Sequence, residues 1–243
     1  MSYLSKVKSG IQSVPRRTLI YGQHGVGKTT MAAQWPEPIL LPTEDGYHHV
    51  NVASGPRLKS ATDLWNAINE VSKSDYKTVI VDSIDWTEMI IQSELDESSF
   101  DQSWGKGQLE VAKRMRKVLQ ALDGCRDAGK HIVLVGHAEA KTIDRPDGLS
   151  YQTYAVKLGK HCSRVVSEWV DEMLFVQRDY LVRQNEGSRA GVGVDKGTRS
   201  FYTTGTPSFE AKNRLPGCAE KFDLNKVKEY ISFSIGKNAK AVK

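Results

Sequence analysis

Short runs of apolar, often β-branched residues alternate along the chain with segments whose apolar residues recur at helical spacing. Several runs lack polar alternation, which is typical of strands that are buried on both faces of a parallel sheet. The predicted strands are 18–21, 39–41, 78–81, 132–135 and 173–177. Because strands and helices alternate, we expect an α/β fold: a mostly parallel central sheet, flanked by helices and joined by right-handed crossovers.

Two helices between these strands are predicted by apolar residues that repeat every three or four positions. The repeating residues are Leu64, Ile68 and Val71 in the first helix, and Val111, Met115, Val118 and Leu122 in the second. Gly124 and Gly129 follow the second pattern, so we expect that helix to end there.

The last third of the chain has a different pattern. Segments 180–184 and 200–204 predict strands on either side of a glycine-rich stretch. The glycines of this stretch are Gly187, Gly191, Gly193 and Gly197. A C-terminal β-hairpin with a long, mobile tip is the simplest arrangement that accounts for them.

The C-terminal end predicts a closing helix at 223–231, with Asp223 as its N-cap. We find no internal repeat and no sign of a second domain. We therefore expect one domain over 1–243, with an N-terminal extension at 1–14 and a basic, flexible tail at 233–243.

Composition excludes several classes of protein. Of the 243 residues, 39% are apolar and 26% charged, a balance that excludes a disordered or a membrane class. No apolar run approaches the ~18 residues that span a bilayer, and the N-terminus has no apolar segment of a secretory signal. Cys125, Cys162 and Cys218 are odd in number and widely separated, which argues against a disulfide framework or a zinc site. A reducing, cytoplasmic location is expected.

The charge of the chain suits a polyanionic partner, but only weakly. The net charge is +5 and the pI about 9.0. From Asp223 to the C-terminus, five lysines stand against two acidic residues. A nucleic-acid-binding arm and a solvated terminus both fit this excess, and charge alone does not decide between them.

Residues 22–29 read GQHGVGKT and match the phosphate-binding pattern G-x-x-x-x-G-K-[ST]. A predicted strand runs into this loop and a helical pattern runs out of it, as the motif requires. The predicted ATP cradle is Gly22, Gln23, His24, Gly25, Val26, Gly27, Lys28, Thr29 and Thr30. Glycines let backbone N–H groups turn toward the phosphates, where Lys28 adds a positive charge and Thr29 offers a hydroxyl to Mg²⁺. The sequence therefore predicts a P-loop nucleotide site.

Polar residues follow the other predicted strands at the edge of the sheet where the cradle lies. Asp82 is the candidate Mg²⁺ ligand, or else a cap for the helix that follows it. Glu44 is the candidate general base, with Asp45 as its competitor. For His137, a γ-phosphate sensor and a structural histidine are both open interpretations.

Taken together, these residues resemble the core of RecA-type ATPases. More narrowly, they resemble the small phage-encoded nucleotide-binding proteins of that group, some of which act in single-strand annealing and recombination. The resemblance covers about residues 15–224, and its discriminating features are Glu44, VIVDS at 79–83, GHAEAK at 136–141 and AKNRLPG at 211–217. It implies a RecA-like P-loop core, ATP and Mg²⁺ as cofactors, and a homo-oligomer that forms a ring or a filament.

The resemblance also implies roles for single residues. In RecA-type ATPases the residue that matches Glu44 polarises the attacking water, and the position of His137 is a polar sensor that is glutamine in many relatives. Basic residues like Lys212 and Arg214 reach the γ-phosphate of a neighbouring subunit in related assemblies, so that hydrolysis depends on assembly. The alternative interpretation of Lys212 and Arg214 is a solvated loop after Pro207.

Two DNA-facing loops follow from the same resemblance. The first covers about 97–107 and contains Trp104 and Lys106, and the second covers about 138–157. The second offers Lys141, Arg145, Tyr151, Tyr154 and Lys157. Aromatic rings stack on bases while basic side chains follow the phosphates, so this mixture suits a single strand. Core packing of Trp104, and contacts of the tyrosines with another subunit, are the alternatives.

The sequence thus predicts an ATPase, stimulated by DNA, that acts on single-stranded DNA in phage-type recombination, annealing or replication, in the host cytoplasm if a phage encodes it. A single-strand-binding protein is a further candidate partner, and a membrane is not. One alternative is a small-molecule or nucleotide kinase whose lid carries Arg183, Arg189 and Arg199. The other is a non-catalytic module in which bound ATP only stabilises an assembly surface.

Overall fold

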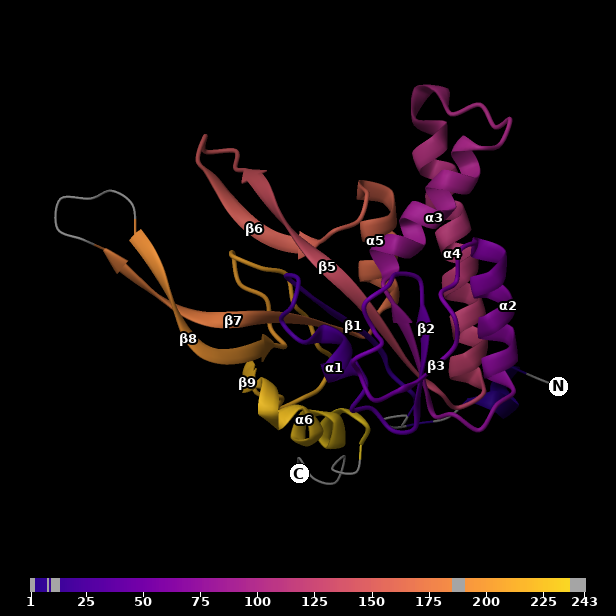
Figure 1. Ribbon diagram of the computed structural model, residues 1–243, viewed down its shortest axis with the longest axis horizontal. Coiled ribbons are helices and arrows are strands. Elements are labelled where there is room, and N and C mark those ends of the chain that lie inside the picture. The colour runs from indigo at the N-terminus through magenta and orange to yellow at the C-terminus, as the bar shows by residue number, and fades with distance from the viewer. Residues whose placement is uncertain (1–2, 8, 10–13, 185–190, 237–243) are drawn as a thin grey trace.

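A mostly parallel sheet forms the centre of the molecule, and helices cover both of its faces (Figure 1). The structure is a computed structural model that describes residues 3–7, 9, 14–184 and 191–236. The strands are β1 (Arg17–Gly22), β2 (Pro38–Pro42), β3 (Ala53–Ser54), β4 (Thr78–Asp82), β5 (His131–Asp144), β6 (Ser150–Val156), β7 (Glu172–Gln184), β8 (Gly191–Tyr202) and β9 (Lys221–Asp223). The helices are α1 (Lys28–Ala32), α2 (Ala61–Ser72), α3 (Ile84–Asp96), α4 (Lys106–Asp127), α5 (Lys160–Trp169) and α6 (Val227–Ser234), with short 3₁₀ turns η1 (Tyr3–Lys6), η2 (Ser103–Gly105) and η3 (Leu224–Lys226).

The order of the strands in the sheet is β3-β2-β4-β5-β1-β7-β8-β9. The strands from β3 to β7 in this order are parallel, whereas β8 and β9 add antiparallel to β7. β6 pairs with the far end of β5, and its Tyr154 also forms an isolated bridge with Phe209. One strand, β5, separates the strand that enters the cradle from the strand that ends in Asp82. This is the RecA-like P-loop core, so the predicted fold class is confirmed.

The parallel strands are apolar at successive positions because both faces of the sheet are buried. In β1, Leu19 and Tyr21 belong to the core that α2, α3, α4 and α5 cover, while Ile20 belongs to the core that α1 and α6 cover. Figure 1 shows the two layers, with α2 to α5 on one side of the sheet and α1 and α6 on the other. Burial of both faces of the sheet therefore explains why apolar and polar residues do not alternate in these strands.

All the predicted parallel strands are present, and two of them extend far beyond their predicted ends. β5 continues past residue 135, and β7 continues past residue 177, so the predicted strand 180–184 is the second half of β7. The β7–β8 hairpin is confirmed, but β8 ends at Tyr202, and Gly191, Gly193 and Gly197 lie within it rather than in a mobile tip. Gly187 and Arg189 lie outside the described residues.

The two predicted helices are α2 and α4. Gly129 follows the end of α4 with φ at +88°, the left-handed region that favours glycine, whereas Gly124 lies inside the helix, so its predicted role is wrong. The closing helix is α6, and the Asp223 carboxylate accepts a hydrogen bond from the Asn225 N–H at the start of the preceding turn η3. Since α6 runs to Ser234, the predicted tail starts two residues inside a helix, and residues 237–243 lie outside the described part of the chain.

Segment 138–157 forms an antiparallel hairpin, so the prediction of a long irregular loop is wrong. The extended end of β5 pairs with β6 from Ala138–Val156 to Asp144–Ser150. Alanine, glutamate, lysine and aspartate make up most of residues 138–144 and are depleted in strands, so their propensity does not predict this part of β5. The other predicted loop, 97–107, is shorter than expected because α4 already begins at Lys106.

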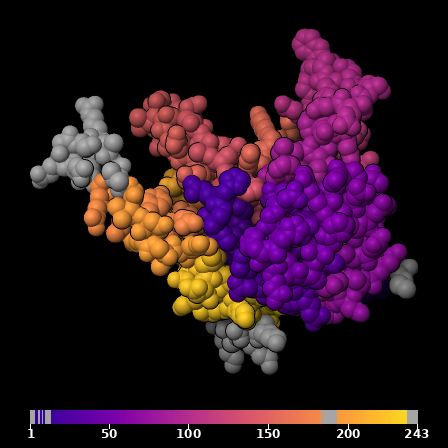
Figure 2. Space-filling view, viewed as in Figure 1, coloured from indigo at the N-terminus to yellow at the C-terminus, as the bar shows by residue number. Residues whose placement is uncertain are grey.

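Three arms project from the body of the molecule (Figures 1 and 2). The β5–β6 and β7–β8 hairpins extend toward the upper left of Figure 1, and the connected ends of α3 and α4 extend toward the upper right. Among the described residues, no helix has the length and apolar character needed to cross a membrane.

Candidate nucleotide site

The phosphate cradle is the turn between β1 and α1. Gly25 and Gly27 have φ angles of +69° and +98°, which lie in the left-handed region that favours glycine. Gly22 lies so close to β7 that an added Cβ would be 2.2 Å from the Val176 carbonyl oxygen. The three glycines of the motif are therefore required by the path and the packing of the backbone.

The cradle opens into a pocket of about 480 Å³ at the carboxyl ends of the parallel strands. The predicted residues that line it are His24, Gly25, Gly27, Lys28, Thr29, Thr30, Glu44, Asp82 and His137. Asp45, Gly46, Tyr47, His49 and Arg199 complete the lining. The structure thus brings the cationic, carboxylate and imidazole candidates together in one concave site.

The predicted cradle residues Gln23 and Val26 do not line the pocket themselves. The Gln23 carbonyl oxygen accepts a hydrogen bond from Lys28 Nζ at 2.9 Å, and Val26 is only 1% exposed within the core. Lys28 itself is buried, and burial lowers its pKa although the charges of Asp82 and Glu44 oppose this. A desolvated ammonium at the floor of the pocket is well placed to bind a phosphate oxygen.

Thr29 and Asp82 meet at the side of the cradle. Thr29 Oγ1 donates a hydrogen bond to Asp82 Oδ2 at 2.7 Å. Burial raises the pKa of Asp82, although this hydrogen bond and the charge of Lys28 act in the opposite direction. Asp82 is not the helix cap of the alternative interpretation, since Ser83 occupies the N-cap position of α3.

This pair of oxygen ligands fits Mg²⁺. The ion prefers oxygen ligands and binds through one or two protein groups together with substrate phosphates and water. Among the described residues, no group of three His, Cys, Asp or Glu side chains could hold a metal alone. A site made of Thr29, Asp82 and bound phosphates agrees with the preference of Mg²⁺ for oxygen ligands.

Glu44 is the carboxylate best placed to act as a base. Its pKa is raised to about 6, first by burial and then by the charges of Asp82 and Asp85 against that of His137. Its competitor Asp45 is 70% exposed and forms an ion pair with Arg57 at 2.8 Å. The geometry therefore favours Glu44 over Asp45.

We expect ATP hydrolysis to rise about tenfold between about pH 5 and about pH 7, because a base with a raised pKa accepts a proton only above that pKa. Glu44→Gln should lower kcat by about 10²- to 10⁴-fold and abolish this rise, as measured by phosphate release across pH. Asp45→Asn is the matched control and should keep both rate and profile. An unchanged profile in Glu44→Gln would assign the titration to another group.

His137 is held in place by Asp85, a residue that sequence reasoning missed. Asp85 Oδ1 accepts the His137 backbone N–H at 3.1 Å, and Asp85 Oδ2 lies 2.8 Å from Nδ1 of the ring. Burial opposes ionisation of Asp85, but these hydrogen bonds and the charge of His137 lower its pKa. The ring stacks on His24 with centroids 4.1 Å apart, and Nε2 lies 4.0 Å from Glu44 Oε1. These contacts with both the cradle and the base favour the sensor interpretation.

Arg199 of β8 is a further residue of the site. Its guanidinium donates a hydrogen bond to the Val26 carbonyl oxygen at 3.4 Å and lies beside Gly27. The kinase alternative included Arg199 in an arginine-rich lid, but the structure places it on a strand of the sheet that packs against the cradle. The only signal for it in the sequence was its place in a strand next to the glycine-rich stretch.

Lys212 and Arg214 lie at the amino ends of the parallel strands, whereas the cradle lies at their carboxyl ends. Lys212 pairs with Met173 at the start of β7, and its Nζ donates to the Ser167 carbonyl oxygen. Arg214 is 61% exposed and lies 3.7 Å from Asp171. β1 is roughly 17 Å long from its amino end to its carboxyl end, and this length separates the two groups of residues. Neither side chain can therefore reach the cradle of its own chain.

The predicted DNA contacts of the first loop lie at the end of the α3–α4 arm. Trp104 is 97% exposed, so it is not part of the core. Lys106 is paired with Asp101 at 2.6 Å, and Gly107 is buried in the first turn of α4.

The predicted DNA contacts of the second loop are distributed along the β5–β6 hairpin. Lys141 and Arg145 are paired with Glu139 and Asp147, and Tyr151 is 39% exposed. Lys157 is exposed where the hairpin returns, and its N–H donates to the His137 carbonyl oxygen. Tyr154 instead stacks on Phe175, and its hydroxyl accepts a hydrogen bond from the Gln23 side chain, so it faces the cradle side and the core.

A known protein family matches this chain over most of its length. The protein-family profile described as "AAA domain" matches residues 14–215. No curated protein sequence matches the chain. A solved structure of a KaiC-like protein from the hyperthermophilic archaeon Pyrococcus horikoshii OT3 is similar, with 12% sequence identity, a TM-score of 0.47, and coverage of 86% of this chain and 85% of that one.

Proposed function

The chain belongs to the AAA domain family and is a P-loop ATPase of the RecA-like fold, and from this premise we propose that it hydrolyses ATP to act on single-stranded DNA in phage-type recombination, annealing or replication. The observation that carries the proposal is the convergence of Lys28, Asp82 and Glu44 in one pocket at the carboxyl edge of the sheet. A phosphate cradle alone binds a nucleotide, whereas a partly buried carboxylate beside it adds a base for hydrolysis.

Each residue of the pocket has a distinct task in this reaction. The backbone N–H groups around Gly25 and Gly27 and the ammonium of Lys28 bind the β- and γ-phosphates. Glu44 takes the proton of the water that attacks the γ-phosphorus, while the bond to the β-phosphate oxygen breaks and ADP is released. Thr29 and Asp82 would hold Mg²⁺, which when bound neutralises charge on the phosphate oxygens.

The route from this site to DNA is the strand β5. His137 lies on β5 at the level of Gly22, and the same strand continues without a break into the β5–β6 hairpin. A change at the γ-phosphate that moves His137 therefore acts directly on the base of the hairpin. The exposed Tyr151 offers a ring for stacking on a base, and Lys141 and Arg145 can exchange their exposed ion pairs for phosphates at little cost.

The second hairpin, β7–β8, extends on the same side as the first (Figure 1). It carries Arg178, Arg183 and Lys196 together with Tyr180, which is 56% exposed. A single strand between the two hairpins would thus meet basic and aromatic side chains from both. Arg199 lies near the C-terminal end of β8 and donates a hydrogen bond to the Val26 carbonyl oxygen. It thus connects the β7–β8 hairpin to the cradle, as His137 connects the β5–β6 hairpin to it.

One set of assays separates this proposal from its alternatives. ATP hydrolysis is measured with and without single-stranded DNA, and DNA binding is measured across salt concentrations. The proposal requires faster hydrolysis with DNA and weaker binding with salt. Transfer of the γ-phosphoryl group to a small acceptor would establish a kinase, and ATP binding without turnover would establish a non-catalytic assembly module.

The proposed DNA contact of the β5–β6 hairpin can be tested separately. Lys141→Gln together with Arg145→Gln removes two phosphate contacts, so the slope of log K against log salt should become shallower by about 1.4. Fluorescence anisotropy of a labelled oligonucleotide measures this slope. Lys113→Gln with Lys117→Gln on α4 removes the same charge elsewhere and should leave the slope unchanged. Equal slopes for the two variants would exclude the β5–β6 hairpin as the DNA contact.

A further inference from the structure

A tryptophan stands almost fully in solvent at the end of the α3–α4 arm. We call residues 97–105 the α3–α4 tip; within it Trp104 is 97% and Phe100 40% exposed. Trp104 has φ at +55°, which is uncommon for a bulky side chain, and Gly105 follows at +77°. Single exposed apolar residues are ordinary, but tryptophan is enriched among the residues that dominate protein interfaces. The tip thus offers a residue of the kind that anchors one protein in the surface of another.

The charge around this anchor is unsuitable for DNA. Segment 92–110 holds five acidic residues and one lysine. That lysine, Lys106, is itself paired with Asp101. An acidic surface repels phosphates and attracts a basic one. The tip is therefore complementary to a basic protein surface with an apolar centre.

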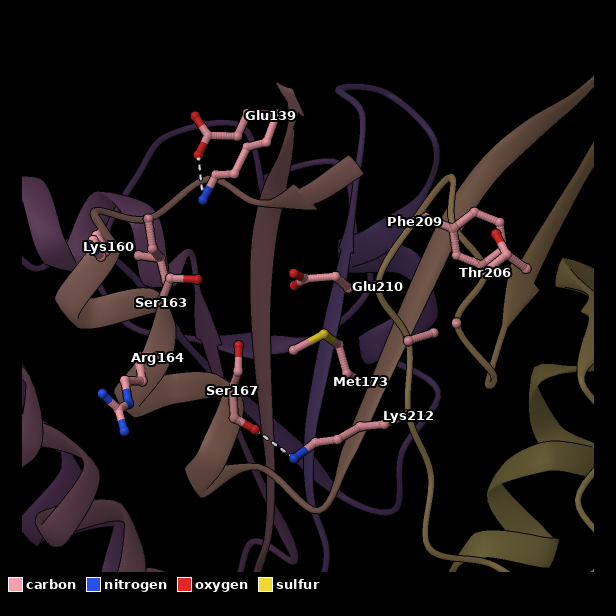
Figure 3. A pocket seen from close by; sticks show the side chains of 14 residues that line it. Glu139, Lys160, Ser163, Arg164, Ser167, Met173, Thr206, Phe209, Glu210 and Lys212 are labelled. Carbon is pink, nitrogen blue, oxygen red and sulfur yellow. Dashed lines mark hydrogen bonds and ion pairs between the residues drawn. The ribbon is translucent and has the colours of Figure 1, made fainter. Parts of the chain in front are cut away.

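The molecule has such a surface in the pocket between α5 and the segment 205–212, which we call the α5 pocket (Figure 3). Its volume is about 900 Å³. Met173 and Phe209 supply apolar contacts, with Leu158 beside them. The cations at its walls are Lys141, Lys160, Arg164 and Lys212, against the acids Glu139 and Glu210.

Two of these cations, Lys160 and Arg164, are exposed at the surface, where a partner can reach them. Figure 3 shows Lys160 and Arg164 on the α5 wall and Phe209 and Lys212 on the opposite side, with Met173 between them. Arg164 is 81% exposed in its ion pair with Glu168, and exposed ion pairs of this kind are exchanged at little cost. The volume of the pocket exceeds that of an indole ring, and the pocket has the opposite charge to the tip.

We propose that the α3–α4 tip of one copy of this chain docks in the α5 pocket of a second copy, with Trp104 as the anchor. The two surfaces are different parts of the chain, so the contact is head-to-tail and repeats from copy to copy into a ring or a filament. This inference takes the homo-oligomer from the resemblance to RecA-type ATPases and does not depend on the proposed action on DNA. It assigns the tip to assembly rather than to DNA.

The same contact would order the proposed trans residues. Lys212 forms part of the wall of the α5 pocket, and Arg214 follows two residues later on the same segment. A tip seated in the α5 pocket would therefore contact the segment that carries both residues. In the copy that supplies the tip, the 13 residues of α3, about 20 Å in length, connect this contact to Asp82 at the edge of the nucleotide pocket.

Sedimentation velocity without DNA, with a non-hydrolysable ATP analogue, tests the proposal. Trp104→Ala should weaken assembly at least about 30-fold. Trp65→Ala, which removes a 49% exposed tryptophan from α2, is the matched control and should assemble as the unaltered protein does. Full assembly of Trp104→Ala, or an unaltered protein that stays monomeric with the analogue, would overturn the proposal.

A charge exchange tests the pairing of the two surfaces. Glu97→Lys with Asp101→Lys reverses the tip, and Lys160→Glu with Arg164→Glu reverses the pocket; all four side chains are exposed, so folding should be retained. Each variant alone should fail to assemble, and an equimolar mixture should assemble because every junction again joins opposite charges. No recovery in the mixture would refute the pairing. ATP binding and DNA binding are measured separately on the same proteins, so a failure of the proposed DNA function is distinguished from a failure of this contact.

Discussion

Lys28→Ala is expected to abolish ATP hydrolysis and to weaken ATP binding by at least about a hundredfold, since it removes the only buried cation of the cradle among the described residues. A charge-assisted hydrogen bond to a phosphate contributes roughly 1.5 to 3 kcal/mol, and an ammonium that contacts two phosphates makes more than one such bond. Isothermal titration with ATP and Mg²⁺ measures the affinity, and phosphate release measures turnover. Unchanged affinity would refute the assignment of residues 22–29 as the phosphate cradle.

This loss should occur without loss of the fold. The pKa of Lys28 is lowered chiefly by burial, which means that the folded protein disfavours its charged form. Alanine has the highest helix propensity, and Lys28 is the first residue of α1. We therefore expect thermal unfolding without nucleotide to be unchanged or slightly stabilised, while stabilisation by added ATP disappears. Lys113→Ala, on the exposed face of α4, is the matched control and should retain both binding and turnover.

The parts of the site that could be predicted from the sequence are those set by short segments. Glycines at fixed spacing, with a lysine and a threonine after them, specify a phosphate-binding turn because the backbone path requires them. Asp82 and Glu44 could be placed because a residue that ends a parallel strand emerges at the edge where ligands bind. Both rules depend on local backbone geometry, which a sequence pattern records.

The parts that could not be predicted depend on contacts between distant segments. Asp85 holds His137 across 52 positions of sequence, and Arg199 reaches Val26 across 173. The buried carboxylate of Glu172 accepts hydrogen bonds from Tyr230 and Ser234 and so binds α6 to the sheet, although no local pattern marks it. Such pairs are decided by how helices and strands pack, and a single sequence shows only that each residue is polar.

The two projecting hairpins show a further limit. Residues 138–144 continue a buried strand into solvent, where no side chain is fully buried and packing no longer requires a run of large apolar residues. Strand propensity is mostly a matter of packing against neighbours, so it is weakest in such arms. For this reason the hairpin that is proposed to contact DNA was predicted as a loop, although its basic and aromatic residues were identified.

Arg214→Ala is expected to lower ATP turnover by about 10³- to 10⁵-fold while leaving ATP affinity unchanged, as for an arginine that stabilises the transition state from a neighbouring subunit. The edge on which Arg214 lies is too far from the cradle of its own chain for a contact within one subunit. Arg214 is also better suited than Lys212, since Arg214 is 61% exposed, whereas the Lys212 ammonium is bound to the Ser167 carbonyl oxygen. Lys212→Ala should therefore have a smaller effect on kcat.

Mixing subunits decides whether the arginine acts in trans. Arg214→Ala keeps an intact cradle, Lys28→Ala keeps an intact Arg214, and each protein alone should be inactive. In an equimolar mixture, a quarter of the junctions would join an intact arginine to an intact cradle, so turnover should return to roughly a quarter of the unaltered rate. Arg116→Ala, on the exposed surface of α4, is the control for loss of an arginine and should be fully active alone. A mixture that stays inactive although it assembles would show that Arg214 does not complete the site of its neighbour, whereas an Arg214→Ala protein that is active alone would show that the cradle needs no arginine from this segment.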